Sequence, residues 1–573
     1  MEVTANLSGN NGSAVRGDTA NGTGVDVAPN VALVGGGADD LLAVTGNATG
    51  DNGTGVQLDG NNILDNTTLS GNATKGAGVD IDGPLTNNGN TTIDGNADKG
   101  NGVELNGAIT GGTVNGTSDS GSGIKVDDDT QLDNATLNGN STDGKGVEIA
   151  GNLSGNNGSA VHGDTVNGTG VDVGENATLS GGGTDDPLEV TGNATGDNGT
   201  GVQLEGNNTL DNTTLAGNAT DGTGVDITGP LVNNGNTTID GNADKGNGVE
   251  LNGAITGGTV NGTSDSGSGI KVDDDTQLDN ATLNGTSPDG KGVEIAGNLS
   301  GNNGSAVHGD TVNGTGVDVG ENATLSGGGQ GDPLAVNGNA TGEKGTGVHI
   351  DGNNTLDNTT INGHSIDGHG VEITGPTTNK GNTTINGNAA GDGHGVHING
   401  SVNGGEVNGN SSNNHGVYVD DFAAINEIAI SGNTGSDKPP VFISLPESIG
   451  DNVTINGKPV NKDTTGGRTK PDPTSEEKTT SEPTAQPQTE DKPGRLLKTR
   501  SQVLSSLEEQ PLPPSIVTEF EHDIAENISV AVCIPEQVTI EPLTKQRVTP
   551  ERELCDTHVL GKWRPLPKTA DQK

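Results

Sequence analysis

The sequence predicts an all-β protein, a right-handed parallel β-helix in which short strands wind into a solenoid of rungs about 24 residues long. Three observations support this prediction. Glycine contributes 100 of the 573 residues and aromatic residues only 1%, which rules out several ordinary hydrophobic cores. A short motif recurs along most of the chain, and the segments around it alternate between apolar and polar residues.

The recurring motif is Gly-x-Gly, followed by Val or Ile and, two places later, by a second apolar residue. The Val or Ile occurs at Val25, Val56, Val79, Val103, Ile124, Val147 and Val171, at successive intervals of 31, 23, 24, 21, 23 and 24 residues. Such a period is too long for one strand and too short for a domain. It matches one rung of a three-sided β-helix.

Each rung contains short segments with the alternation of a half-buried strand. In residues 102–105 (Gly-Val-Glu-Leu) the two large apolar side chains point to one side and Glu104 points to the other. Residues 91–96 follow the same pattern. Glycine and asparagine between these segments supply the positive φ angles that tight turns require.

Three long copies of the sequence make up a domain that we predict to span residues 1–436. The segment that begins at Asn6 returns from Asn152 and from Asn298, at steps of 146 residues (152 − 6 and 298 − 152). About 18 rungs spaced about 4.8 Å apart would form a rod on the order of 85 Å long. A feature that recurs in every copy is more readily explained by structure than by catalysis.

The rest of the chain divides into three predicted parts. Residues 437–462 contain several large apolar residues and are expected to cap the open end of the helix, which otherwise exposes unpaired strand edges. Residues 463–495, rich in Pro, Thr, Glu and Lys, are expected to form a flexible linker. Residues 496–573 are predicted to be a small C-terminal module, which holds both cysteines and the only tryptophan.

The chain carries 77 acidic and 27 basic residues, a formal net charge of -50. This argues against nucleic acid and anionic membranes as partners, because both favour basic patches. No apolar run is long enough to span a membrane, and residues 1–4 lack the pattern of a signal peptide. We expect a secreted or cell-surface protein, in which case the chain is a fragment or its leader is missing.

Motifs for cofactors are weak in this sequence. Gly-x-Gly recurs in every rung without a strand-helix-strand unit, and residues 139–146 place Gly146 where a phosphate loop needs Ser or Thr. The acidic run at residues 127–129, repeated at 273–275, could bind calcium loosely. A solvated turn explains it more simply, so we expect no cofactor.

A carbohydrate-active enzyme is the main alternative, because hydrolases and lyases also use β-helices. Glycoside cleavage needs two carboxylates at a fixed separation in one groove. The acidic pairs at residues 39–40 and 185–186 are copies of each other, and the third copy has Gly331-Asp332 instead. Since no unique pair emerges and aromatic platforms for sugars are nearly absent, no enzymatic activity is predicted.

Histidines are concentrated in the third copy. His369, His394 and His415 each precede a Gly-Val step, and His349 and His397 each follow one. Stacked on successive rungs, they would form a ladder able to bind a transition metal or respond to pH. Other rungs carry Thr, Asn, Ser or Lys in such places, so we interpret them as substitutable surface positions and predict no metal site.

Asn-x-Ser/Thr triplets are abundant and could accept glycans in an exported protein. A chain made of Asn, Gly and Thr also produces them by chance, and its turns need asparagine in any case. The candidate acceptors are Asn6, Asn21, Asn47, Asn66, Asn72, Asn90, Asn115, Asn134 and Asn140.

The only two cysteines, Cys533 and Cys555, lie in the predicted C-terminal module. In an exported protein an isolated pair most simply forms a disulfide, which would stabilise the module by roughly 3 kcal/mol. Two unrelated thiols, or a Cys-His pair with His558, are the alternatives.

With these features the chain resembles the filamentous-haemagglutinin-like exoproteins of two-partner secretion, which are large surface adhesins of Gram-negative bacteria. The resemblance rests on repeats such as residues 100–107, the proline-rich linker and the near-terminal cysteines. It implies an outer-membrane two-partner transporter as partner, to which a loop closed by Cys533 and Cys555 would tether the adhesin, and glycosylation of the triplet asparagines. The family's N-terminal secretion domain is missing here, and 18 residues follow Cys555 (573 − 555).

The leading hypothesis is therefore an adhesin that attaches to host-cell or bacterial surface glycans or proteins through many weak contacts along a rod. The alternative is a carbohydrate-active β-helix enzyme, a polysaccharide hydrolase or lyase of the tail-spike type.

Overall fold

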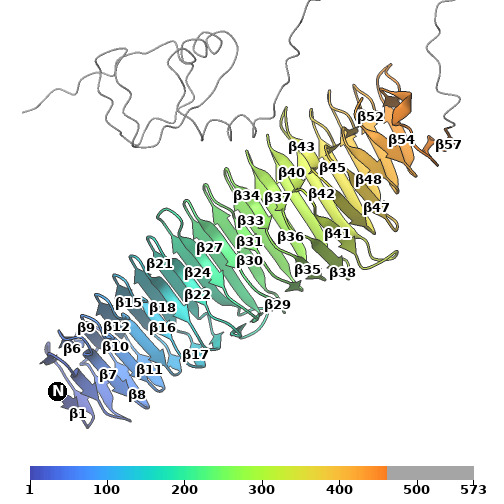
Figure 1. The fold of residues 1–573 in the computed structure, drawn as a ribbon. Coiled ribbons are helices and arrows are strands. Elements are labelled where there is room, and N and C mark those ends of the chain that lie inside the picture. The colour runs from blue at the N-terminus through green and yellow to red at the C-terminus, as the bar shows by residue number, and fades with distance from the viewer. Residues whose placement is uncertain (461–573) are drawn as a thin grey trace, which may run out of the picture. The chain divides into compact units, whose positions relative to one another are not determined.

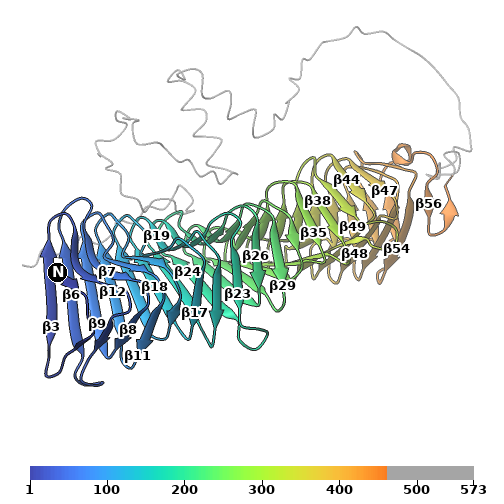
Figure 2. The same ribbon diagram turned by 90° about the horizontal axis from the view of Figure 1, so that it is seen from below.

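The computed structural model describes residues 1–460, which wind into a β-solenoid with three parallel sheets running along its length (Figure 1). The chain makes about 19 turns of roughly 24 residues, and almost every turn adds one strand to each sheet. The stacked turns are seen from a second side in Figure 2. The prediction of an all-β parallel β-helix is thus confirmed.

Sheet A contains the strands that begin at or just after the Gly-x-Gly motif. Its 19 strands are β1 (Glu2–Val3), β4 (Thr23–Val27), β7 (Thr54–Asp59), β10 (Val79–Asp82), β13 (Val103–Asn106), β16 (Ile124–Val126), β19 (Lys145–Ile149), β22 (Thr169–Val173), β25 (Thr200–Leu204), β28 (Thr223–Ile227), β31 (Val249–Leu251), β34 (Ser268–Val272), β37 (Lys291–Ile295), β40 (Thr315–Val319), β43 (Thr346–Ile350), β46 (Val371–Ile373), β49 (Val396–Ile398), β52 (Val417–Val419) and β55 (Val441–Ile443).

Sheet B follows sheet A in each turn and has shorter strands. They are β2 (Leu7–Ser8), β5 (Ala32–Val34), β8 (Asn62–Asp65), β11 (Leu85–Asn88), β14 (Ile109–Thr110), β17 (Thr130–Asp133), β20 (Leu153–Asn156), β23 (Thr178–Gly181), β26 (Asn208–Asp211), β29 (Leu231–Asn234), β32 (Ile255–Thr256), β35 (Thr276–Asp279), β38 (Leu299–Asn302), β41 (Thr324–Gly327), β44 (Asn354–Asp357), β47 (Thr377–Lys380), β50 (Ser401–Asn403) and β53 (Ala424–Asn426).

Sheet C completes the turn, and most of its strands have a glycine at the centre of an Asn-Gly-Asn-like triplet. They are β3 (Ala14–Thr19), β6 (Leu42–Ala48), β9 (Thr67–Ala73), β12 (Thr92–Ala97), β15 (Thr113–Ser118), β18 (Thr136–Ser141), β21 (Ala160–Thr165), β24 (Leu188–Ala194), β27 (Thr213–Ala219), β30 (Thr238–Ala243), β33 (Thr259–Ser264), β36 (Thr282–Ser287), β39 (Ala306–Thr311), β42 (Leu334–Ala340), β45 (Thr359–Ser365), β48 (Thr384–Ala389), β51 (Glu406–Ser411), β54 (Ala429–Thr434), β56 (Thr454–Ile455) and β57 (Lys458–Pro459).

The register of sheet A follows the sequence motif. Val25 pairs with Val56, Val56 pairs with Val79, and the same step continues through Val103, Ile124, Val147 and Val171. Each interval between motifs is therefore one turn, whether it contains 21 or 31 residues. The longer turns carry an additional loop that is closed by an antiparallel bridge, as between Gly37 and Asp40.

The interior of the solenoid is filled by stacked Val, Leu and Ile side chains. Val103, Leu105 and Ile93 are fully buried, whereas Glu104 faces outward between its two buried neighbours. Most strands follow this alternation, and their buried side chains stack on their equivalents in the next turn. A narrow interior of small aliphatic residues explains why the rod needs almost no aromatic residues.

Asparagines in the left-handed conformation close the corner between sheets B and C. Asn66 has φ 49°, and Asn212 and Asn358, its equivalents in the other copies, have φ 48° and 50°. The Nδ2 of Asn66 donates to the Oδ1 of Asp65 at 2.8 Å, and its Oδ1 accepts the backbone N–H of Asn90 in the next turn at 3.2 Å. Asparagine tolerates this conformation better than other residues with a side chain.

The last turns keep the solenoid pattern and then end in a hairpin. Strand β55 pairs with β52, and β56 pairs with β54, both in parallel. A single 3-10 turn, Pro446–Ser448, is the one helical element of residues 1–460, and β57 returns antiparallel to β56. No helix in this part of the chain is long and apolar enough to cross a membrane. The predicted linker, the C-terminal module and its Cys533 and Cys555 lie outside the described residues.

Candidate functional sites on two faces of the solenoid

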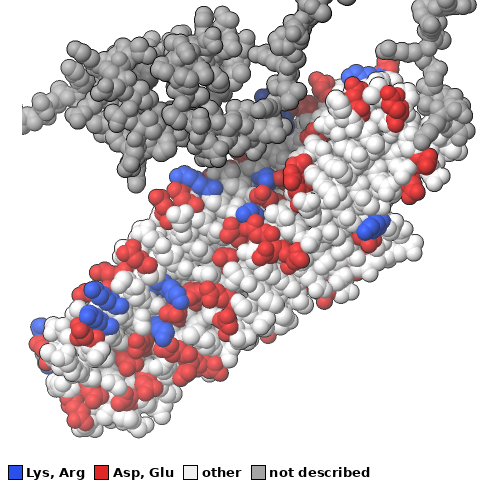
Figure 3. Space-filling model, viewed as in Figure 1, with Lys and Arg blue, Asp and Glu red and all other residues white. Residues whose placement is uncertain are grey.

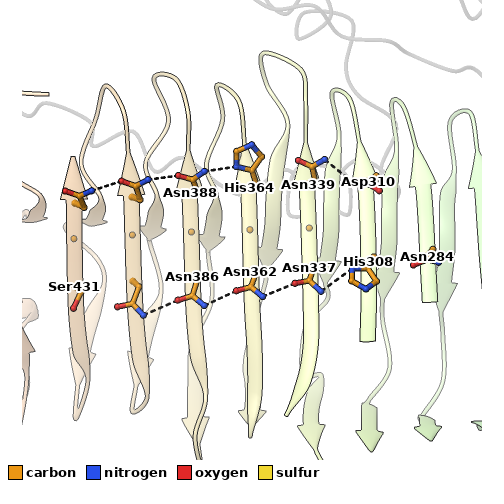
Figure 4. A pocket seen from close by; sticks show the side chains of 18 residues that line it. Asn284, His308, Asp310, Asn337, Asn339, Asn362, His364, Asn386, Asn388 and Ser431 are labelled. Atoms are coloured by element: carbon orange, nitrogen blue, oxygen red, sulfur yellow. Dashed lines mark hydrogen bonds between the residues drawn. The ribbon is translucent and has the colours of Figure 1, made fainter. Parts of the chain in front are cut away.

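Sheet C presents two outward rows of polar side chains, one on each side of its central glycines. In the third copy the first amide row comprises His308, Asn337, Asn362, Asn386 and Asn408, and the second amide row comprises Asp310, Asn339, His364, Asn388, Asn410 and Asn433. Between the rows lies an open groove with a volume of ≈ 960 Å³, whose floor is the backbone at the glycines (Figure 4). We call it the amide groove.

Hydrogen bonds lock the first amide row along the axis of the rod. The Nδ2 of Asn362 donates to the Oδ1 of Asn337 at 2.8 Å, and Asn386 donates to Asn362 at 2.9 Å. Asn408 extends the chain by donating to Asn386 at 3.0 Å, and Asn337 meets the Nδ1 of His308 at 3.2 Å. Because all the asparagines donate in the same direction, each amide has a defined orientation.

The second amide row is built in the same way but is interrupted once. Asn433 donates to Asn410 at 3.0 Å, Asn410 to Asn388 at 2.8 Å, and Asn388 meets the Nδ1 of His364 at 2.8 Å. Asn339 donates separately to the carboxylate of Asp310 at 3.1 Å. An interior member of a row, such as Asn362, uses one N–H and one lone pair for the row, so its second N–H and second lone pair are left for a ligand.

The unbroken first row is specific to the third copy. In the second copy the equivalent places hold Thr191, Ala216 and Asp240, each 146 residues before Asn337, Asn362 and Asn386. Alanine has no hydrogen-bonding side-chain group and an ionised carboxylate only accepts, so Ala216 and Asp240 cannot pass a hydrogen bond along the row. On the face shown in Figure 3 charged residues become sparser toward the C-terminal turns but remain along its edges. Among the lining residues of the groove, Asp310 is the one carboxylate.

Sheet A carries a very different outward row, which is acidic in the first two copies. Asp80 lies opposite Glu104, and Asp226 lies opposite Glu250. Burial, and then the neighbouring Glu104, raise the pKa of Asp80 to about 6, and burial with Glu250 does the same to the pKa of Asp226. Two carboxylates of the row therefore repel each other at two equivalent places, one in each of the first two copies.

In the third copy this acidic row changes into histidine and aromatic residues. Glu372, His397, Tyr418 and Phe442 follow one another on successive strands of sheet A. A second line, formed by His369, His394 and His415, runs beside it. The rings stack: His369 and His394 have centroids 5.3 Å apart and an interplanar angle of 1°, and His394 lies 4.6 Å from Tyr418 at 13°. We call these seven residues the histidine-aromatic cluster.

His349, one turn before the cluster, belongs to a charge network. Its Nδ1 lies 2.7 Å from the carboxylate of Asp318, and its Nε2 lies 3.1 Å from the hydroxyl of Thr374. Lys291 is 2.7 Å from the other oxygen of Asp318. The hydrogen bond to Asp318 raises the pKa of His349 despite its burial. Burial raises the pKa of Asp318, but hydrogen bonds from His349 and Lys291 outweigh it and leave that pKa below its usual value.

The acidic residues weighed as an enzyme's carboxylate pair have a structural role instead. Asp40 accepts the backbone N–H groups of Asn11 at 2.6 Å and of Gly12 at 2.9 Å in the preceding turn, and these two bonds lower its pKa. Asp186 and Asp332 make the same contacts in the later copies. They anchor the additional loops of the longer turns.

The acidic runs considered for calcium are likewise engaged by neighbouring side chains. Asp127 forms an ion pair with Lys125 at 2.5 Å, and Asp129 accepts the Nδ2 of Asn152 at 2.8 Å. In the second copy Lys271 pairs with Asp273 at 2.8 Å. These contacts involve one carboxylate oxygen each of Asp127, Asp129 and Asp273.

The structure separates the candidate glycan acceptors into three environments. Asn47, Asn72 and Asn115 lie in the outward rows of sheet C, where their Nδ2 atoms donate to the preceding turn. Asn66 and Asn134 close left-handed corners. Asn140 also lies in an outward row of sheet C, between Thr117 and Asp164 of the adjacent turns. The remaining acceptors, Asn6, Asn21 and Asn90, are exposed. A glycan on an asparagine of an outward row would compete for space with the next turn.

Sequence reasoning located the histidines but missed the amide groove and the partners of the histidines. Both depend on the register between neighbouring turns. A turn contains 21 to 31 residues, and this number decides which side chains of two turns lie opposite each other. Aligning the Asn-Gly-Asn triplets turn by turn would have revealed the substitution of Thr191, Ala216 and Asp240 by asparagines.

Comparison with known proteins places this fold in no family: no family model, no curated protein and no solved structure matches the chain. The fold defines the class of protein, a β-solenoid, and sheet C gives it outward rows of polar side chains.

Proposed function

We propose that the protein is a secreted or cell-surface adhesin, whose rod attaches to surface glycans through repeated weak contacts along the amide groove. The observation that carries the proposal is the unbroken first amide row, in which hydrogen bonds orient the amides and leave a second N–H and a second lone pair on interior members such as Asn362 and Asn386. An extended glycan presents hydroxyl groups at regular intervals. Contacts to successive turns, about 4.8 Å apart, would therefore add along one ligand.

The chemistry of the groove suits a neutral or weakly charged glycan. Amide groups bind hydroxyls as both donor and acceptor, and their preorganised orientation reduces the entropy lost on binding. The net charge of -50 disfavours strongly anionic ligands at long range. Secretion through an outer-membrane two-partner transporter and tethering by Cys533 and Cys555 belong to the same proposal and rest on the family resemblance.

The proposal is tested by glycan-array and cell-binding assays on the full chain and on a triple variant, Asn337→Thr, Asn362→Ala and Asn386→Asp. Each substitution introduces the residue of the second copy, so the solenoid is known to accommodate it. We expect glycan binding by the parent chain and its loss in the variant. The matched control is Asn207→Ala, at an exposed corner outside the groove, which should bind normally.

The alternative function, a polysaccharide hydrolase or lyase, requires a pair of carboxylates within reach of one sugar linkage. Among residues 1–460, Asp310 is the single carboxylate that lines the amide groove. Release of shortened oligosaccharides from a bound glycan, abolished by Asp310→Asn, would favour the enzyme over the adhesin.

A further inference from the structure

Three residues of the histidine-aromatic cluster converge on one point of sheet A. His369 lies in the turn before β46, Glu372 is the central residue of β46, and His397 is the central residue of β49, directly opposite Glu372. One ligand atom from each lies within 4.8 Å of the others, and the two imidazole centroids are 4.7 Å apart. We call these three residues the His-Glu-His group.

The geometry of the group offers lone pairs to a metal ion. The Nδ1 of His369 accepts the backbone N–H of His394 at 3.1 Å, which places a lone pair there that a metal could take in exchange for that hydrogen bond. The Oε1 of Glu372 lies 3.3 Å from the Nδ1 of His397 on the neighbouring strand, so both atoms face the same point.

Neighbouring residues provide the outer contacts that metal-bound histidines usually have. The Nδ1 of His397 lies 3.3 Å from Glu372, while its Nε2 lies 3.8 Å from the carboxylate of Asp420 on the other side. An Nε2–H directed at Asp420 would leave Nδ1 free for a metal, which is the usual arrangement of carboxylate, histidine and metal. The stacked ring of His394 forms a wall beside the group, and its buried Nδ1 has no hydrogen-bond partner.

The group occurs once among the three copies. Its equivalents are Ala77, Asp80 and Glu104 in the first copy and Thr223, Asp226 and Glu250 in the second. The earlier copies thus oppose two carboxylates with no imidazole between them. The third copy replaces one carboxylate by His397 and adds His369, which turns a repulsive pair into a set of nitrogen and oxygen ligands. A structural requirement of the fold does not explain the change, since the other copies fold without it.

We propose that the His-Glu-His group binds a divalent transition-metal ion of the zinc class, through one nitrogen of each imidazole and one carboxylate oxygen of Glu372. Imidazole and carboxylate suit zinc, and three protein ligands on a partly exposed strand surface leave a further position open to water or to a ligand from outside. The site lies on sheet A, whereas the proposed glycan contacts lie on sheet C, so the two proposals stand independently.

The test is titration of the chelator-treated full chain with ZnCl2 by isothermal calorimetry, together with the absorption spectrum of the Co2+ form. We compare the parent chain with His369→Thr and His397→Glu, which introduce the residues of the second copy and are therefore expected to fold. The parent chain should bind one more equivalent of Zn2+ than either variant, or bind it at least about tenfold more tightly. Asp420→Asn should weaken binding in the same range without removing the ligand set.

Residues 461–573 are identical in all these chains, so any zinc bound by Cys533, Cys555 or the histidines of that segment cancels in the comparison. The matched control is His364→Asn, which removes a histidine of sheet C and also restores the residue of the second copy, Asn218. It should bind zinc like the parent chain. Equal zinc binding by the parent, His369→Thr and His397→Glu chains would overturn the proposal, as would loss of the same equivalent in His364→Asn.

Discussion

Glu372 and His397 stand directly opposite each other on β46 and β49, with 3.3 Å between Oε1 and Nδ1. In the second copy of the repeat the same two places hold Asp226 and Glu250. One backbone geometry therefore carries an attractive pair in one copy and a repulsive pair in another. The two copies can therefore be compared directly to find how an attractive or a repulsive pair in an outward row affects stability.

The repulsive pairs predict that Asp226→Asn, or Asp80→Asn, stabilises the rod at pH 7. The pKa of Asp226 in the folded chain, about 6, lies above the usual value of 3.8, so between these values the folded chain binds more protons than the unfolded chain. Stability therefore falls as pH rises through this window. The gain should be about 1 kcal/mol after allowance for partial exposure, and thermal melts at pH 7 and pH 3.5 should show it only at the higher pH.

The exposed turn carboxylate Asp274 provides the control for this prediction. Asp274→Asn removes the same charge from the chain, but Asp274 does not lie opposite a carboxylate in the outward row of sheet A. The substitution should therefore not raise the melting temperature at pH 7 relative to pH 3.5. If Asp274→Asn stabilised the rod as much as Asp226→Asn does, relief of the net charge of -50 would be the cause, not the opposed pair.

The charge network of His349 predicts a further loss of stability with rising pH, in a window above pH 6.5. The pKa of His349 is raised above 6.5 by Asp318, so the stability that this pair contributes is fully present below pH 6.5 and is lost as pH rises through the raised pKa. His349→Gln, which introduces the residue found at Gln203, should remove this component. Melting temperatures measured from pH 5.5 to 8.5 should decline in the parent chain and stay flatter in the variant, whereas His364→Asn should follow the parent.

Much of the fold could be predicted from the sequence because the signal is local and repeated. The Gly-x-Gly-Val motif at Val56 and Val79 marks the same place in two turns, and the alternation at Glu104 separates buried from exposed side chains. The functional candidates depend instead on pairs such as Asn337 with Asn362, or Glu372 with His397, about one turn apart. The number of residues in each turn varies, so composition and motifs alone do not reveal which of them are opposed.

The corner asparagines provide a prediction about backbone conformation. Asn66→Ala should destabilise the rod by about 2 kcal/mol, because alanine disfavours the left-handed conformation and both side-chain hydrogen bonds are lost. Asn66→Gly loses the same hydrogen bonds, but glycine tolerates the positive φ. This variant should therefore destabilise the rod about half as much as Asn66→Ala. Hydrogen exchange at Asn90, whose backbone N–H donates to Asn66, measures the change locally. If Asn66→Ala and Asn66→Gly destabilised the rod equally, the left-handed conformation would not contribute to the effect and the prediction would be wrong.

The glycines at the centre of sheet C predict the largest effect on stability. A Cβ on Gly363 would lie 1.9 Å from the carbonyl oxygen of Gly370 and 2.7 Å from the Cγ2 of Val371, so sheet A would have to move away. Because backbone atoms cannot yield as a flexible side chain does, we expect Gly363→Ala to cost about 3 kcal/mol and to lower the melting temperature of the surrounding turns.

Gly331 is the matched control for this substitution, since a Cβ there meets no atom within 4 Å and the equivalent residue of the second copy is Asp185. Gly331→Ala should therefore leave the melting temperature and the pattern of hydrogen exchange unchanged. The comparison distinguishes close packing from a general effect of glycine replacement on the unfolded chain, which would act at both positions alike. A Gly363→Ala chain as stable as Gly331→Ala would mean that sheets A and C can separate at no cost, and the tight glycine contact would then not explain the glycine content of the rod.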